Sequence, residues 1–120
     1  MQKTILTIAG SDPSGGAGAQ ADLKVFADHG LYGLSAITAL TAQNSSEVVA
    51  SVPVSSEFLK MQVEVLLDEF RPLAVKTGMT ATASNIRAIC RIIKAHSLRN
   101  VVVDTVMRST LGFSLLDRQG

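Results

Sequence analysis

The residues best suited to chemistry gather in four short segments that are polar or rich in glycine. These are residues 10–18, 43–46, 78–79 and 104–112. The first segment holds four glycines, which allow the backbone to approach a ligand closely and to direct amide groups at it from the start of a helix. We expect Gly15, Gly16 and Gly18 to be required for the shape of the backbone, and a simply flexible loop is the alternative.

Asp22 and Gln43 carry the side chains that best fit recognition of a ligand. Asp22 lies three residues after Ala19 and four before Phe26, which places a carboxylate on an otherwise apolar helix face. Burial of a carboxylate is costly unless it is paired or used, so we expect it to accept an N–H or O–H group of a ligand. A first-turn carboxylate that the helix dipole stabilises is the alternative. Gln43 can donate and accept at once, as the edge of a heterocycle requires, although a solvated glutamine at a strand end is an equal alternative.

Met79 and Asp104 are further candidates, each with a structural alternative of its own. Met79 could lie against a flat ring, but methionine more often belongs to the core. Asp104 could orient a metal or a phosphate, with a helix cap or a turn as the equal alternative. His29 and His96 fall at predicted helix ends and Cys90 on an apolar helix face, so we interpret all three as structural. The sequence contains no Ser/His/Asp set and no metal-ligand spacing.

Two known phosphate-binding patterns can be compared with the glycine-rich segment. Residues 10–15 have the glycine spacing of a P-loop, but Gly16 and Ala17 stand where that loop needs Lys and Ser or Thr. Residues 16–21 match the dinucleotide-binding pattern, yet they do not follow the preceding strand directly, and the ribose-binding acid is missing. A dinucleotide-binding domain is therefore the less favoured alternative.

Alternating strands and helices must position these segments. Apolar and β-branched runs predict strands over residues 4–9, 34–42, 48–54, 73–77 and 101–103. Helical spacing predicts helices over residues 17–28, from the capping residues Ser55 and Ser56 to Phe70, and from Thr82 or Ser84 to Ile93. The order β-α-β-β-α-β-α-β favours an α/β fold with a mostly parallel sheet and helices on its faces. Ligands of such sheets bind beyond the carboxyl ends of the strands, where the four segments fall.

Composition and charge restrict the class of protein. The 120 residues are 47% hydrophobic and 18% charged, with 11 Lys and Arg against 10 Asp and Glu. Because there is no basic run, we expect neither nucleic acid nor a membrane surface as a partner. The first apolar run is too short for a signal peptide or a membrane span. The single cysteine fits a reducing compartment, which predicts a cytoplasmic protein.

Four sequence segments closely resemble the hydroxymethylpyrimidine/phosphomethylpyrimidine kinases of thiamin biosynthesis, in the ribokinase-like superfamily. They are AGSDPSGGAGAQADLK at 9–24, TALTAQN at 38–44, KTGM at 76–79 and VDTVM at 103–107, in the family's order and spacing. The resemblance implies a three-layer ribokinase-like (Rossmann-like) fold, with residues 1–120 as the N-terminal half of a single kinase domain. The implied C-terminal half, with the ATP-binding surface and the catalytic machinery, would lie outside these residues. The Val-rich strand predicted near the end, typical of a sheet centre, also indicates part of a larger domain.

The resemblance further implies transfer of the γ-phosphoryl group of ATP, with Mg²⁺, to 4-amino-5-hydroxymethyl-2-methylpyrimidine and then to its monophosphate. The implied pyrimidine site comprises Gly10, Ala17, Asp22, Gln43, Met79 and Val106, and Asp104 matches an aspartate near phosphate or Mg²⁺. The family suggests a homodimer for the full-length enzyme, and the 120 residues alone are expected to be inactive. A non-catalytic pyrimidine-binding module is the alternative. Leu111 departs from the family pattern and weakens the assignment of residues 110–112 to phosphate.

Overall fold

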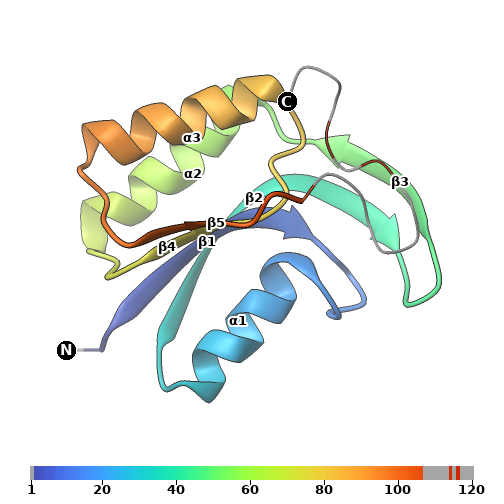
Figure 1. The fold of residues 1–120 in the computed structure, drawn as a ribbon, viewed down its shortest axis with the longest axis horizontal. Coiled ribbons are helices and arrows are strands. Elements are labelled where there is room, and N and C mark those ends of the chain that lie inside the picture. The colour runs from blue at the N-terminus through green and yellow to red at the C-terminus, as the bar shows by residue number, and fades with distance from the viewer. Residues whose placement is uncertain (1, 107–113, 115, 117–120) are drawn as a thin grey trace.

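The computed structural model describes residues 2–106 together with Ser114 and Leu116, and these form three layers, with a five-stranded sheet between helices (Figure 1). In chain order the elements are β1 (Thr4–Ser11), α1 (Gly18–Asp28), β2 (Tyr32–Gln43), β3 (Val48–Pro53), α2 (Ser56–Glu69), β4 (Val75–Thr77), α3 (Ala83–Ala95) and β5 (Val101–Val103). Helix α1 covers one face of the sheet, and α2 and α3 cover the other. The predicted element order and α/β class are therefore confirmed.

Strand β1 lies at the centre of the sheet, whose order is β3-β2-β1-β4-β5. It runs parallel to both neighbours, so that Leu6 is in register with Leu34 on one side and Val75 on the other. Leu6 and Ile8 are completely buried, as expected for an apolar strand that is covered on both faces. Strand β3 is antiparallel to β2 and lies at the edge of the sheet. Pro53 has no backbone N–H to donate, and an edge strand tolerates such a residue.

The main core lies between the sheet and helices α2 and α3. The helical residues Leu59 and Val63 are completely buried, and Ile89 and Ile92 are nearly so. Cys90 was expected on this apolar face, but it is exposed, so that placement is wrong. Each helical residue turns the chain by about 100°, which carries the residue after Ile89 away from the buried side.

The helix ends follow the expected capping chemistry. Ser55 caps α2 by accepting a hydrogen bond from the amide of Phe58, and Thr82 caps α3 in the same way. His29 and His96 are the C-terminal caps of α1 and α3, as expected of structural histidines. Among the residues that the structure describes, none of the helices combines the length and apolar composition that a membrane-spanning segment requires.

Strand β5 is the outermost strand on the β4 side of the described sheet. Its composition predicted a central strand, yet Val102 and Val103 are 62% and 65% exposed. The reason is that, within the described part of the chain, β5 pairs with β4 alone. The Val-rich triplet therefore presents apolar side chains at a sheet edge.

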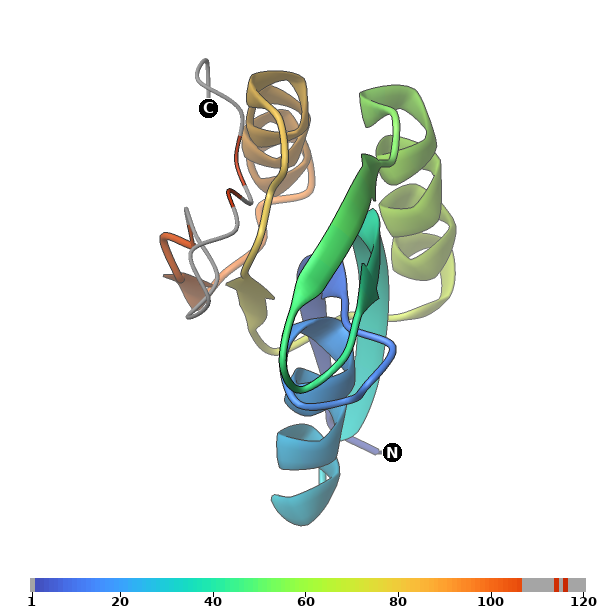
Figure 2. The same cartoon turned by 90° about the vertical axis from the view of Figure 1, so that its right-hand side faces the viewer.

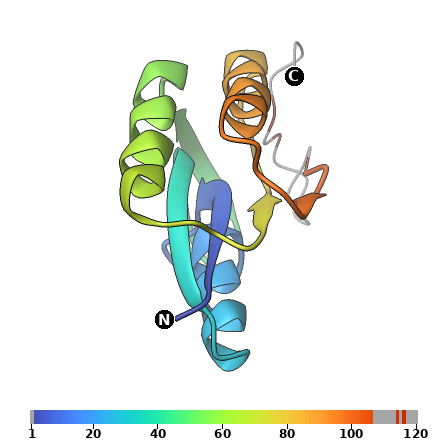
Figure 3. The same ribbon diagram turned by 90° about the vertical axis from the view of Figure 1, so that its left-hand side faces the viewer.

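The parallel strands place their carboxyl ends on one side of the molecule. Figure 2 looks onto that side, where the loop after β1 and the turn between β2 and β3 come forward together. Figure 3 shows the opposite side, toward which the N-terminus points. Because β1, β2, β4 and β5 all run in one direction, the segments that follow them share a single region.

Candidate functional site

A cavity of about 720 Å³ lies at the carboxyl ends of the parallel strands. Its wall includes every residue that the sequence singled out for binding: Gly10, Ala17, Asp22, Gln43, Met79, Asp104 and Val106. The size is that of a pocket for a small organic ligand. The structure thus brings these residues together, and their roles in binding stay predictions.

Asp12, which the sequence analysis did not single out, organises the glycine-rich loop between β1 and α1. Its carboxylate is buried, and Oδ1 accepts hydrogen bonds from the Ser14 amide at 2.8 Å and the Ser14 hydroxyl at 2.7 Å. Oδ2 accepts the Ala17 amide at 2.9 Å. We expected this loop to direct its amides at a ligand, but these two amides bind Asp12 instead. Neither of these two amides is therefore free to bind a ligand.

The hydrogen bonds of Asp12 predict a pH-dependent contribution to stability. Burial raises the pKa of Asp12, but hydrogen bonds from the Ser14 hydroxyl and from the amides of Ser14, Ala17 and Gly16 outweigh it, so the pKa lies below its ordinary value of 3.8. A depressed folded-state pKa stabilises the fold above the ordinary pKa, and this contribution is lost as the pH falls through the folded pKa. We expect Asp12→Asn to lower the unfolding free energy by about 1–3 kcal/mol near neutral pH, and by less below about pH 3.5.

Urea unfolding of both proteins across this pH range measures that difference. The exposed Asp28, at the end of α1, supplies the control Asp28→Asn, which should cause little change at any pH. A cost of Asp12→Asn that is as large at acidic as at neutral pH would contradict the assignment.

Two of the three loop glycines adopt the left-handed conformation. The backbone angle φ is +80° at Gly15 and +61° at Gly18. At Gly18 a Cβ would also collide with the carbonyl oxygen of Gly10, whereas at Gly16 it would find no atom closer than 3.8 Å. The expectation that glycine is required holds at Gly15 and Gly18 and is wrong at Gly16, where φ is not positive.

Asp22 faces the sheet from α1, as its place on the apolar helix face predicted. Its Oδ2 accepts the Thr7 hydroxyl at 2.6 Å and the Lys76 ammonium at 2.8 Å. Helix α1 has no acidic residue in its first turn, so the dipole alternative does not apply. Sequence reasoning missed both partners, although a hydroxyl within one apolar strand and a charge within another are visible signals.

Gln43 ends β2 and Met79 follows β4, the two strands that flank β1. The Thr41 hydroxyl lies 2.7 Å from both the Gln43 side-chain amide and the Ser11 carbonyl oxygen, and its single proton can serve only one of the two, so this contact places the Gln43 amide beside the end of β1. Met79 packs over Gly10 and is only 7% exposed, so it belongs to the core as well as to the cavity. The Thr38 hydroxyl donates to the Met79 carbonyl oxygen at 2.6 Å and so fixes the segment that carries this methionine.

Asp104 and Val106 complete the wall after β5. The Asp104 amide donates to the Thr77 carbonyl at 2.9 Å, which continues the pairing of β5 with β4. Asp104 is exposed, and within residues 2–106, 114 and 116 no three His, Cys, Asp or Glu side chains group as metal ligands would. The expectation for residues 110–112 lies outside the described residues.

Comparison with known proteins gives consistent matches over nearly the whole chain. A family model described as phosphomethylpyrimidine kinase matches residues 12–120. The hydroxymethylpyrimidine/phosphomethylpyrimidine kinases of Bacillus subtilis and Salmonella typhimurium are 47% and 45% identical over 111 residues. These alignments cover 92% of this chain but 41% and 42% of the relatives, so the chain spans about two fifths of their length.

Solved structures agree with the sequence matches. The phosphomethylpyrimidine kinase of Clostridium difficile 630 superposes with a TM-score of 0.89 at 44% identity, covering 98% of this chain and 51% of that protein. The Staphylococcus aureus pyridoxal kinase in complex with AMP-PCP and pyridoxal has a TM-score of 0.79 at 38% identity, covering 89% of this chain and 40% of that protein.

Proposed function

Because the chain belongs to the phosphomethylpyrimidine kinase family and has its ribokinase-like fold, we propose that it forms the pyrimidine-binding part of a hydroxymethylpyrimidine/phosphomethylpyrimidine kinase. The reaction is transfer of the γ-phosphoryl group of ATP to the hydroxymethyl oxygen of 4-amino-5-hydroxymethyl-2-methylpyrimidine, and then to the monophosphate, in thiamin biosynthesis. One observation carries the proposal: the residues that match the family's substrate site, from four separate segments, line one cavity.

The chemistry of the cavity wall fits an uncharged aminopyrimidine. Asp22 supplies a hydrogen-bond acceptor, and Gln43 supplies an amide that can both donate and accept. Met79 offers a polarisable apolar surface for the face of a ring. Held in this way, the hydroxymethyl group is presented to a phosphoryl donor in a fixed geometry, which lowers the entropic part of the barrier.

ATP and Mg²⁺ are proposed as the donor and its metal. Relatives among the pyridoxal kinases were solved with AMP-PCP or ADP, which supports a nucleotide donor. Mg²⁺ commonly takes one or two carboxylates and completes its shell with water and substrate phosphates, so the exposed Asp104 fits as one such ligand. Among the described residues of the cavity wall, Lys76 is the one basic side chain. Most contacts to the nucleotide phosphates would therefore come from outside this part of the chain.

Asp22→Asn is expected to weaken binding of the pyrimidine alcohol by roughly ten- to a hundredfold. The substitution removes a charged hydrogen-bond acceptor, an effect of about 1.5–3 kcal/mol. Titration calorimetry of the chain with 4-amino-5-hydroxymethyl-2-methylpyrimidine measures this, with pyridoxal and NAD as competing candidates. Asp28→Asn, an exposed substitution on the same helix, is the matched control.

The calorimetry also tests the proposed function itself. Preferential binding of pyridoxal would assign the chain to the chemistry of its pyridoxal kinase neighbours, and binding of NAD would support the dinucleotide alternative. If the affinity of Asp22→Asn for the pyrimidine alcohol equals that of the wild type, Asp22 does not bind this ligand.

A homodimer and a cytoplasmic location are further parts of the proposal. Leu40 and Val52 are paired across β2 and β3 and are 57% and 63% exposed. With the exposed Ala42 and Ala50 they form an uncovered apolar face, as expected where a second copy packs. Sedimentation of the full-length protein tests the dimer. The exposed, unpaired thiol of Cys90 supports a reducing compartment.

A further inference from the structure

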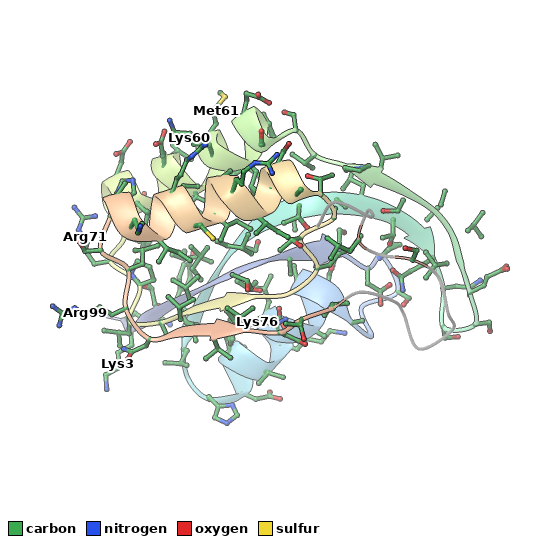
Figure 4. All side chains as sticks on the ribbon, turned by 45° about the horizontal axis from the view of Figure 1, so that its top comes forward. Lys3, Lys60, Met61, Arg71, Lys76 and Arg99 are labelled. Atoms are coloured by element: carbon green, nitrogen blue, oxygen red, sulfur yellow. The ribbon has the colours of Figure 1, made fainter. Side chains whose placement is uncertain are left out.

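Two side chains from different strands converge on one carboxylate oxygen at the edge of the cavity. Thr7 of β1 and Lys76 of β4 both donate to Oδ2 of Asp22, at 2.6 Å and 2.8 Å. Thr7 is completely buried, while the side chains of Lys76 and Asp22 are 24% and 18% exposed. Figure 4 shows Lys76 beside helix α1, the helix that carries Asp22. This cluster joins β1 and its neighbour β4 to α1.

Both donors bind the same oxygen, which leaves the other one available. Across the described part of the chain, no donor reaches Oδ1 of Asp22. Each carboxylate oxygen can accept about two hydrogen bonds, and an ionised carboxylate donates none. Asp22 lines the cavity, and Oδ1 is its oxygen that has no donor among the described residues.

The backbone makes room for the Lys76 ammonium at a defined place. A Cβ at Gly78 would lie 2.9 Å from Nζ of Lys76 and 3.2 Å from Cβ of Ala9. The Gly78 amide donates to the carbonyl oxygen of Ile8 at 2.9 Å, which holds this part of the backbone against β1. Any side chain at position 78 would crowd the ammonium. The absence of a side chain at position 78 therefore leaves the space that the Lys76 ammonium occupies.

The charge balance of the wall explains why this position matters. Its described acids are Asp12, Asp22 and Asp104, against the single ammonium of Lys76. Asp12 is satisfied within its own loop, so Asp22 depends on Lys76 for compensation of its charge. Without the ammonium, the Asp22 carboxylate would keep the Thr7 hydroxyl alone and could turn either oxygen toward the ligand.

We propose that Lys76 is a positioning residue that acts through Asp22 to set the ligand specificity of the cavity. By holding Oδ2, it fixes Oδ1 as an acceptor and so selects pyrimidines that donate an N–H or O–H group at this point. The inference rests on the proposed pyrimidine site. The inference adds that Lys76 influences the ligand specificity of that site without itself contacting the ligand.

The experiment measures how strongly the chain discriminates between ligands with and without a donor. Three probes are titrated by calorimetry: the aminopyrimidine alcohol, its analogue without the amine and its analogue with methyl in place of hydroxymethyl. The proteins are wild type, Lys76→Met, Lys76→Arg and the control Lys60→Met, whose lysine lies on α2, away from Lys76 (Figure 4). Melting curves are recorded for each.

In wild type we expect the loss of one of the two donors to weaken binding roughly ten- to a hundredfold. In Lys76→Met this penalty should fall to about threefold or less, because a carboxylate that Lys76 no longer holds must be ordered by the ligand itself. Lys76→Arg should restore part of the penalty, and Lys60→Met should leave it at the wild-type value.

A merely structural role for Lys76 would give a different result. Lys76→Met would then lower the melting temperature and leave the penalty at its wild-type size, which would overturn the inference. If Lys76→Met does not fold, Gly78→Ala is the second variant, since it displaces the ammonium without removing it. A full wild-type penalty in Gly78→Ala, or no penalty in wild type, would equally overturn the inference. Failure of wild type to bind the intact pyrimidine would instead overturn the proposed function.

Discussion

The 120-residue chain, supplied with saturating pyrimidine alcohol and Mg-ATP, is expected to release ADP at least roughly ten-thousandfold more slowly than a full-length relative. Phosphoryl transfer requires groups that position the donor and neutralise charge on the γ-phosphoryl oxygens. The described residues of the cavity wall offer Asp104 and one ammonium, Lys76, and the latter is bound to Asp22. Loss of a single electrostatic stabiliser costs about a hundred- to a thousandfold, and here more than one is missing from the described wall.

A coupled assay for ADP measures this, with the Bacillus subtilis kinase, 47% identical to the chain, as the positive control. Binding of the pyrimidine without turnover would separate acceptor recognition from catalysis. Turnover within tenfold of the control would show that the catalytic groups lie in this chain, and would refute the division of labour proposed for it.

Gly18→Ala is expected to destabilise the fold by about 2–4 kcal/mol, or roughly 10–20 °C in melting temperature. A side chain at this position meets two costs. It must adopt a φ of +61°, which non-glycine residues rarely tolerate, and its Cβ must displace the backbone of Gly10. Gly10 belongs to the cavity wall, so the affinity for the pyrimidine should fall together with the stability.

Gly16→Ala provides the matched control in the same loop. Gly16 has no positive φ and has space for a methyl group, so the substitution should change stability by less than about 1 kcal/mol. Thermal melting of the two variants side by side tests the contrast. Equal melting temperatures would mean that the loop relaxes around Gly18 and that its geometry is not decisive.

The position of the cavity could be predicted from sequence because it follows from a rule about topology. Parallel strands end on one side of a sheet, so segments far apart in the chain, such as those of Gly10, Gln43 and Met79, are brought together once the element order is known. The element order itself depended on local patterns, namely apolar runs for strands and helical spacing for α2 and α3.

The partners of Asp22 could not be predicted in the same way. Lys76 lies on β4, and only the register of β4 against β1 places its ammonium next to a carboxylate from α1. No spacing along the chain encodes that contact. The prediction that Cys90 lies on the apolar face of its helix was wrong for another reason. Helical spacing is also satisfied when the apolar face is drawn one residue too wide, as it was at Cys90.

The central position of β1 in the sheet has a consequence for folding of the chain during its synthesis on the ribosome. Leu6 pairs with Leu34 on one side, but its partner on the other side, Val75, is synthesised much later. At about 5–20 residues per second, translation leaves that flank of β1 unpaired for roughly 3–14 s after Leu6 is made. During this interval the apolar strand is an open sheet edge, able to pair with other nascent chains. The arrangement that places Asp22 and Lys76 side by side thus also leaves an apolar strand edge open during early synthesis.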